Sequence, residues 1–300
     1  MDMITNRHTS RAYERWWARY QRDTGTDAIT AWTVQQWLQT LARQGLSMSS
    51  VRQARAALTK MAKARRLRGM MERDDYLSLV LEVETPRPAQ PTARRKRRWL
   101  TLDELRAVTG ALCAGRTEPA RARNRVIALM LGTLGLREQE ICAAQWGDLA
   151  EGRLAVRGKG GSYQVVNVPE LLQEALATWR ALVQTSGTYG EDTPIIRRVW
   201  KSGKVDGRGL GTSSVYRLVR EAGERAGVGV VSPHDLRATV AGLLADAGVP
   251  VEDISRLLRH KNQEVTRRYI GRRGAKAGHV MAALLAEEAP TLPARQQKLL

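Results

Sequence analysis

SPHDLRATVAGLLADAGVPVEDISRLLRHKNQEVTRRY, residues 232–269, is the stretch that decides the fold. Its opening, Ser232-Pro233-His234-Asp235, places an N-cap residue, a first helical proline and a capping-box acid in the order that begins a helix. His234 lies in the first turn of that predicted helix, and Arg237 follows three residues later on the same face. Because free backbone N–H groups at a helix N-terminus attract anions, we expect this face to bind a phosphate.

The composition of the chain indicates what kind of molecule carries the phosphate that this face is expected to bind. The chain has 300 residues, enough for two domains, and 43% of them are apolar, enough for real cores. Its 49 Lys and Arg against 30 Asp and Glu give a net charge of +19. A charge of this size favours a nucleic acid as partner over an anionic membrane surface. No apolar run reaches the roughly 18 to 20 residues of a spanning helix. We therefore expect a cytoplasmic, nucleoid-associated protein.

Cysteine and acidic residues give no sign of a metal site. Cys113 and Cys142 are far apart in the sequence and each lies in a helical pattern. We expect both to be free, buried thiols in a reducing cytosol rather than a disulfide or a metal-binding pair. No D-x-D or H-E-x-x-H pattern is present, so clustered carboxylates for metal-assisted chemistry are not predicted.

The first 84 residues are predicted to form a helical DNA-binding bundle. Helical spacing of apolar residues predicts four helices. An aromatic face on the first helix, from Tyr13 to Tyr20, is interpreted as core. The third helix, expected to begin after Ser50 and to end before Gly69, carries many basic residues and no acid. The predicted helices span residues 10–22, 33–43, 51–68 and 74–83.

That basic helix is the first candidate DNA contact. Solvated helix faces usually mix charges of both signs, and this one does not. We interpret it as lying against a phosphate backbone or in a major groove, with a solvated face as the alternative. The residues concerned are Arg52, Arg55, Lys60 and Lys63.

A proline-rich basic linker is predicted over residues 85–98. Three prolines in residues 84–92 rule out a continued helix and favour an extended strap. The run RRKRR that follows has the composition of a nuclear-localisation signal or of a solvated tail. Its place between two domains favours a third interpretation, a strap that crosses the duplex. Its candidate DNA contacts are Arg94, Arg95, Lys96, Arg97 and Arg98.

A second, catalytic domain is predicted over residues 99–288, with a tail over 289–300. A capped helix of about a dozen residues begins near Thr101, and an apolar helix over 123–134 breaks at Gly135. Arg137 then opens another helix, with Glu140 placed to hold its guanidinium or to form an ordinary surface pair. Two strands are predicted around Gly158–Gly161, with Lys159 at the tip. Helices follow at about 170–184 and 214–226, and residues 185–211 suggest no function.

These motifs together resemble the tyrosine recombinase (phage integrase) family. They are Gly135-Leu136-Arg137 with Glu140, Gly158-Lys159-Gly160, His234-Asp235-Leu236-Arg237, and Leu257-Leu258-Arg259-His260 followed by Tyr269. The resemblance covers residues 99–270, and more loosely the helical first half. It implies a mainly α fold with a small β-sheet or hairpin, in which a helical bundle and an α+β catalytic domain close as a clamp on DNA. It also implies strand exchange through a covalent phosphotyrosine, without metal or cofactor.

The family chemistry assigns a role to each matched residue. Arg137, Arg237 and His260 would stabilise the charge on the phosphate in transfer, and Glu140 would orient Arg137. Tyr269 would be the nucleophile. His234 is the candidate base for the tyrosine proton, and Lys159 the candidate acid for the leaving 5′-oxygen.

The chain departs from the family pattern just before His260. Family members usually carry glycine there, to end a helix, and this chain carries Arg259. Arg259 must therefore adopt a costly backbone conformation or end the helix differently. Ala238 replaces a residue that is often basic or an imidazole in the family, and we expect no catalytic loss from that change.

A final amphipathic helix is predicted over 276–288, with the tail after it. The helix would pack on its own domain or dock on a neighbouring protomer; strand exchange by four active sites favours docking in trans within a homo-tetramer. The expected partner is a double-stranded recombination site, with accessory DNA-bending or directionality factors. Two alternatives stay open: a type IB topoisomerase-like enzyme, and a catalytically inactive architectural DNA-binding protein.

Overall fold

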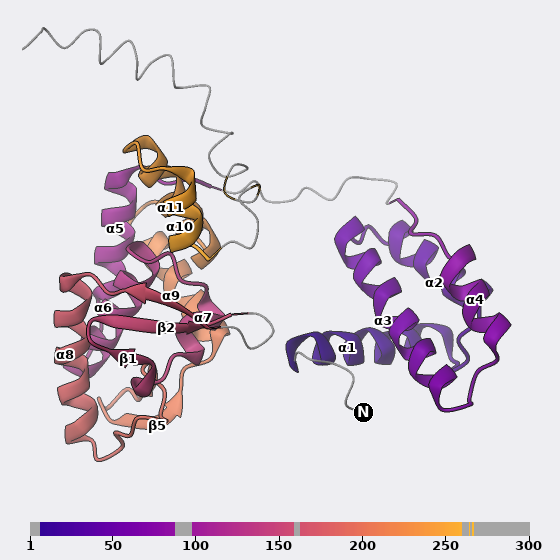
Figure 1. Ribbon diagram of the computed structural model, residues 1–300, viewed down its shortest axis with the longest axis horizontal. Coiled ribbons are helices and arrows are strands. Elements are labelled where there is room, and N and C mark those ends of the chain that lie inside the picture. Colours follow the sequence, from indigo (N-terminus) through magenta and orange to yellow (C-terminus); the bar gives the residue numbers. More distant parts are fainter. Residues whose placement is uncertain (1–6, 88–97, 159–162, 260–263, 265, 267–300) are drawn as a thin grey trace, which may run out of the picture. The chain divides into compact units, whose positions relative to one another are not determined.

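The protein divides into two compact units, Met1–Lys96 and Arg97–Leu300, a division that lies inside the predicted linker. The computed structural model describes residues 7–87, 98–158, 163–259, 264 and 266. The described part of the first unit is helical, and that of the second combines helices with two small sheets (Figure 1). This confirms the predicted fold class, mainly α with a small sheet beside the second group of helices.

In the described part of the first unit, residues 7–87, four helices pack around an aromatic core. Tyr20 and Trp37 are buried at its centre, with ring centroids 5.2 Å apart, and Trp16 meets Trp37 edge-on at 6.2 Å. The interpretation of the aromatic face as core is therefore confirmed for these residues. The helices are α1 (Arg7–Thr24), α2 (Ala31–Arg43), α3 (Met48–Leu67) and α4 (Arg73–Glu82).

The start of α3 differs from the prediction. Ser47, rather than Ser49 or Ser50, is the N-cap, and its hydroxyl accepts a hydrogen bond from the Ser50 backbone N–H at 3.2 Å. Three serines in four residues compete for this role, and residue type alone does not choose among them. The end of the helix is as predicted, since Gly69 follows at a φ of +70°.

Seven α-helices and one 3-10 turn are described in the second unit. The apolar helix predicted from Arg123 begins five residues earlier, because Thr117 is its N-cap and Pro119 occupies its first turn. The elements are α5 (Leu102–Cys113), α6 (Glu118–Gly132), α7 (Glu138–Ala143), η1 (Trp146–Asp148), α8 (Glu170–Thr185), α9 (Thr212–Arg225), α10 (Pro233–Asp246) and α11 (Val251–Leu257).

The predicted hairpin supplies two strands of a three-stranded sheet. Its strands are β2 (Arg153–Arg157) and β3 (Tyr163–Asn167), paired antiparallel with Leu154 opposite Val166. A short strand, β1 (Leu149–Ala150), adds to the other edge of β2. Residues 185–211, which suggested no function, contain a second hairpin made of β4 (Arg197–Val199) and β5 (Val205–Gly209).

Helix α10 lies against α5, α6, α9 and α11, so it links the parts of the second unit (Figure 1). Its predicted capping box is present: Ser232 Oγ accepts from the Asp235 N–H at 3.2 Å, and Asp235 Oδ2 accepts from the Ser232 N–H at 2.9 Å. Thr239 Oγ1 accepts a further hydrogen bond from the Leu100 N–H at 2.9 Å. The start of the unit is thereby tied to α10.

Both cysteines are free thiols, as predicted, although they are half-buried rather than fully buried. Burial raises the pKa of the Cys142 thiol to about 12, with the nearby Glu138 carboxylate adding to the shift. Burial also raises the pKa of Cys113. Neither thiol is therefore a ready nucleophile at neutral pH.

Candidate active site

The candidate site begins at the N-terminus of α7. Gly135, at a φ of +54°, turns the chain after α6, and Arg137 then occupies the N-cap position in an extended conformation. Glu140 accepts hydrogen bonds from the Arg137 backbone N–H at 2.8 Å and from Arg137 Nη1 at 2.5 Å. The Glu140 side chain is 7% exposed, whereas that of Arg137 is 43% exposed. Glu140 thus holds Arg137 in the manner the sequence suggests, with the guanidinium open to solvent.

Arg237 reaches the same place from α10. Its Nη1 donates to the Gly135 carbonyl and its Nη2 donates to the Leu258 carbonyl at the end of α11. The side chain is 1% exposed. The structure thus shows the Arg237 guanidinium bound to two backbone carbonyls, and its contact with a phosphate stays a prediction.

Arg259 adopts the costly backbone conformation, the first of the two possibilities raised by its sequence position. Its φ is +53°, and its N–H donates to the Arg256 carbonyl at 3.1 Å, so it terminates the turn after α11 as a glycine would. Its side chain then folds back into the unit. Nη2 donates to Glu140 Oε2 at 2.8 Å, and Nη1 donates to the Leu257 carbonyl.

One carboxylate therefore stands among three guanidinium groups. Arg137 and Arg259 contact Glu140 directly, and Arg237 Nη1 lies 4.0 Å from Glu140 Oε2. Burial pushes the pKa of Glu140 up, but the charges of Arg259 and Arg137 and the hydrogen bonds from Arg137 outweigh it, so the pKa lies below its usual value. Glu140 is ionised at neutral pH, and the cluster keeps an excess of positive charge.

The other predicted catalytic residues are only partly covered by the structure. His234 lies in the first turn of α10 and its side chain is exposed. Lys159, His260 and Tyr269 lie outside the described residues, as does the predicted helix over 276–288. The described residues therefore bring together Arg137, Glu140 and Arg237. They add Arg259, which sequence reasoning noted for its backbone and not for its side chain.

The four predicted DNA contacts on α3 line a single pocket of about 570 Å³ in the first unit. The pocket is formed by α1, α3 and α4, and two tyrosines lie among the basic residues. Arg55 is partly engaged, since its Nη2 donates to the Val80 carbonyl at 3.2 Å. The lining residues are Tyr13, Arg52, Arg55, Ala56, Thr59, Lys60, Lys63, Tyr76 and Val80.

Of the basic linker run, only Arg98 is described. Its backbone N–H donates to Asp235 Oδ1 at 3.2 Å, and its Nη2 donates to Glu104 Oε1 at 2.7 Å. Its Nη1 donates to the Val228 carbonyl. Arg98 is thus hydrogen-bonded within the second unit while its side chain stays 41% exposed, and its contact with DNA remains a prediction. Residues 94–97 lie outside the described residues.

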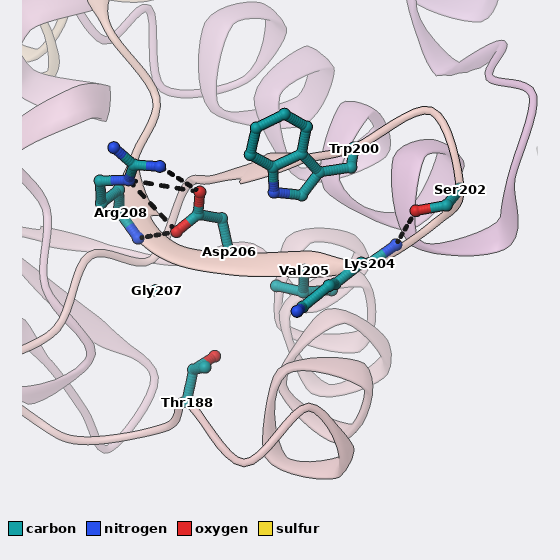
Figure 2. A pocket seen from close by; sticks show the side chains of 8 residues that line it. All are labelled: Thr188, Trp200, Ser202, Lys204, Val205, Asp206, Gly207 and Arg208. Carbon is teal, nitrogen blue, oxygen red and sulfur yellow. Dashed lines mark hydrogen bonds and ion pairs between the residues drawn. The ribbon is translucent and has the colours of Figure 1, made fainter.

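A second basic surface surrounds the β4–β5 hairpin. One pocket there has a volume of about 570 Å³, and within it Asp206 pairs with Arg208 at 3.2 Å. Figure 2 shows this pair beside Trp200. A neighbouring pocket of about 800 Å³ is lined in part by Arg198 and Lys201, and the Arg198 guanidinium lies 4.1 Å from the Trp200 ring centroid. The alternation of basic and aromatic residues in Arg198-Val199-Trp200-Lys201 was the available sequence signal.

The described residues hold neither a cluster of metal ligands nor a membrane-spanning helix. Among them, no three His, Cys, Asp or Glu side chains gather in a way that could hold a metal ion. In the same part of the chain, no helix combines the length and the apolar character needed to cross a membrane.

Comparison with known proteins agrees with the motif order. The family model for the phage integrase family matches residues 98–274, more than half of the chain. This chain belongs to the phage integrase family. The matched segment contains α5 to α11 and every residue of the arginine cluster. The resemblance inferred from the sequence is therefore confirmed.

Relatives of this family member include named recombinases. Tyrosine recombinase XerA of Thermococcus kodakarensis is 32% identical over 173 residues, which are 57% of this chain and 56% of that protein. Tyrosine recombinase XerC of Corynebacterium glutamicum is 25% identical over 239 residues, 79% of this chain and 72% of the relative. The chain thus spans little more than half the length of the XerA relative.

A solved structure shares the fold. A lambda integrase tetramer bound to a Holliday junction superposes with a TM-score of 0.60 at 20% identity, over 90% of this chain and 73% of that chain. At this identity the likeness establishes the fold of this family member alone.

Proposed function

We propose that this chain is a site-specific DNA recombinase that cuts and rejoins strands through a covalent 3′-phosphotyrosine. The observation that carries the proposal is the cluster of Arg137, Arg237 and Arg259 around the single buried carboxylate of Glu140, in a member of the phage integrase family. Its excess positive charge suits a phosphodiester, whose non-bridging oxygens gain negative charge during transfer. The reaction would integrate, excise or resolve DNA through a Holliday junction.

Arg137 is the residue that first meets the phosphate. Its side chain is 43% exposed, and its Nη1 is held by Glu140, so the rest of the planar group can face a ligand. Arg237 contributes charge from inside the unit. To contact a phosphate oxygen directly, it exchanges its hydrogen bond to the Gly135 or Leu258 carbonyl for one to the ligand.

The remaining steps use residues matched to the family motifs. Tyr269 attacks phosphorus, forming the phosphotyrosine bond as the bond to the 5′-oxygen breaks. A phenol has a pKa near 10, so the arginine charges and His234 assist the loss of its proton. Lys159 supplies a proton to the leaving 5′-oxygen, and His260 donates to a non-bridging oxygen.

DNA binding is assigned to both units. The pocket with Arg52 and Lys63 supplies phosphate contacts in the first unit, and the surface with Arg198 and Lys201 supplies them in the second. The functional form is a homo-tetramer on paired recombination sites, with the helix over 276–288 docked in trans. Accessory DNA-bending or directionality factors complete the assembly, which acts at the nucleoid.

The two alternatives gain no observation of their own. A type IB topoisomerase shares the phosphotyrosine chemistry, and an inactive architectural protein shares the basic surfaces. Neither accounts for the recombinase relatives and the arginine cluster together. A topoisomerase would relax supercoiled DNA without joining two sites, and an inactive protein would form no covalent complex.

Tyr269→Phe tests the assignment of the nucleophile. The experiment uses a nicked suicide substrate, built on the duplex that the full-length protein enriches from a random pool. Wild-type protein should form a covalent protein–DNA complex, and the variant should bind the duplex with unchanged affinity and form none, because it lacks the attacking oxygen. The complexes are resolved by denaturing electrophoresis. A variant that still becomes trapped on the DNA would contradict the role given to Tyr269.

A further inference from the structure

Arg259 occupies a position where a large side chain is unfavourable. At a φ of +53° the backbone suits glycine, and any residue with a Cβ is strained there. The side chain is 4% exposed, so its charge is also removed from water, and that burial lowers the pKa of the guanidinium. Both costs fall on one residue, and an interaction that requires the guanidinium must offset them.

That interaction is with Glu140. Its two oxygens are divided among their donors: Oε1 accepts from Arg137 Nη1 at 2.5 Å, and Oε2 accepts from the Arg137 N–H and from Arg259 Nη2, both at 2.8 Å. Arg259 therefore holds the side of the carboxylate that faces Arg237, whose Nη1 is 4.0 Å from Oε2. Without Arg259, Glu140 would be free to rotate toward Arg237 and to loosen its hold on Arg137.

We propose that Arg259 is a positioning residue of the active site, which acts through Glu140 to fix the guanidinium of Arg137 and to leave it electropositive toward a phosphate. The inference rests on the proposed strand-cleavage function. Arg259 and Arg137 share the single negative charge of Glu140. The positive charge of Arg137 is therefore only partly neutralised, and more of it remains available to an anion. The arginine thus performs a task that a glycine at the same turn cannot.

The alternative is that Arg259 is an ordinary buried ion pair that stabilises the fold. The two explanations differ in which quantity changes when Arg259 is replaced. Arg259→Gly removes the side chain but suits the positive φ, so we expect it to fold and to keep its thermal stability close to that of the wild type. A structural role would lower thermal stability; a positioning role lowers the rate of strand cleavage.

The test measures single-turnover formation of the Tyr269-dependent covalent complex on the nicked duplex enriched from a random pool. We expect Arg259→Gly to bind this DNA with wild-type affinity and to cleave roughly 10- to 100-fold more slowly. Arg259→Lys, which keeps the charge, should recover part of the rate, and Arg259→Met should not. Arg256→Ala is the matched control, since Arg256 lies on α11 with a side chain 80% exposed and pairs only with Asp253 in the described contacts.

A double variant tests whether the effect runs through Glu140. Adding Glu140→Gln to Arg259→Gly should slow cleavage no more than Glu140→Gln alone, because both changes break the same link. Independent, multiplying effects would overturn the inference, as would wild-type cleavage by Arg259→Gly. Absence of any Tyr269-dependent complex with wild-type protein would overturn the proposed function, and the inference with it.

Discussion

Glu140 is the carboxylate that three arginines of the described site share. Its pKa is lowered because Arg259 and Arg137 outweigh the effect of burial. A carboxyl group whose pKa is lower in the folded than in the unfolded protein contributes stability that is fully present above the unfolded value. That contribution is lost as the pH falls through the folded value. For Glu140 the loss therefore begins below its ordinary pKa of 4.5.

Glu140→Gln should destabilise the second unit at pH 7 by about 3–5 kcal/mol, because it leaves Arg259 buried without its carboxylate. The difference from the wild type should begin to shrink as the pH falls below 4.5, and it should vanish as the pH passes through the lower pKa of the folded state, where the Glu140 carboxylate becomes protonated. Urea unfolding at a series of pH values, monitored by tryptophan fluorescence, measures the loss of stability at pH 7 and its dependence on pH.

Glu104→Gln is the matched control for that prediction. Glu104 also caps a helix and pairs with an arginine, Arg98, but its side chain is 30% exposed. We expect its replacement to cost less than about 1 kcal/mol. A Glu140→Gln deficit that is independent of pH would contradict the ionic role of Glu140.

Short-range contacts were predictable at this scale, and long-range ones were not. The capping box of Ser232 and Asp235 and the pair of Arg137 and Glu140 each span three residues, so helix geometry predicts them. Arg259 meets Glu140 across 119 residues. Nothing in the sequence near either residue encodes that contact, which depends on how α7 and α11 pack.

Gly135, between α6 and α7, lets two elements approach closely. A Cβ built there would lie 2.6 Å from Leu258 Cδ2, and Leu258 is itself buried in a cluster with Val240 and Ile254. Gly135→Ala should therefore lower the free energy of unfolding by about 1–3 kcal/mol from overpacking, in addition to the cost of the positive φ. Chemical denaturation of the purified variant measures the sum of the overpacking cost and the backbone cost.

Gly248→Ala separates the two costs. Gly248 also has a positive φ, +79°, but an added Cβ would meet no atom within 4 Å. Its replacement should show the backbone cost alone, about 1–2 kcal/mol. Equal losses at the two glycines would show that Leu258 moves aside and that the contact with Gly135 is not tight.

Elements with a regular pattern were predicted, and short or irregular ones were missed. The helical period is clear over the long helices α2 and α8, so their positions agree with the structure to within two residues. The strands β4 and β5 are short and include Gly207 and Gly209, which weaken any strand signal. Their pairing comes from the packing of the second unit rather than from local preference.

We expect particular residues, rather than the net charge of +19 as a whole, to determine how the protein binds DNA. Arg52 and Lys63 line the pocket on α3 and have exposed side chains. Replacing both by glutamine should weaken DNA binding about equally for all sequences. It should also reduce the slope of log K against log salt by roughly 2, because each lost phosphate contact contributes about 0.9. Fluorescence anisotropy over a series of salt concentrations provides the measurement.

Arg66→Gln combined with Arg68→Gln is the control. Both residues are exposed on or just after the same helix and are absent from the pocket lining, so the pair removes the same charge from a different place. The slope should change little. An equal change in both double variants would mean that DNA responds to the overall charge of the first unit and not to this pocket.

At the scale of the molecule, composition and motif order sufficed to predict the family, a helical first unit and a mixed second one. They did not predict that Arg98, which was assigned to the linker, would donate hydrogen bonds to Asp235 and Glu104. Charge runs indicate affinity for polyanions, but they do not show which members of a run are already engaged within the protein.

The two carbonyl bonds of Arg237 also bear on how the protein is made. One acceptor, Gly135, is synthesised well before Arg237, and the other, Leu258, is synthesised after it. Arg259, which pairs with Glu140, is synthesised directly after Leu258. The arginine cluster therefore cannot be completed on a nascent chain until α11 and Arg259 have been translated. A polypeptide released before Arg259 lacks both this arginine and Tyr269, so under the proposed function such a product should not cleave DNA by this chemistry.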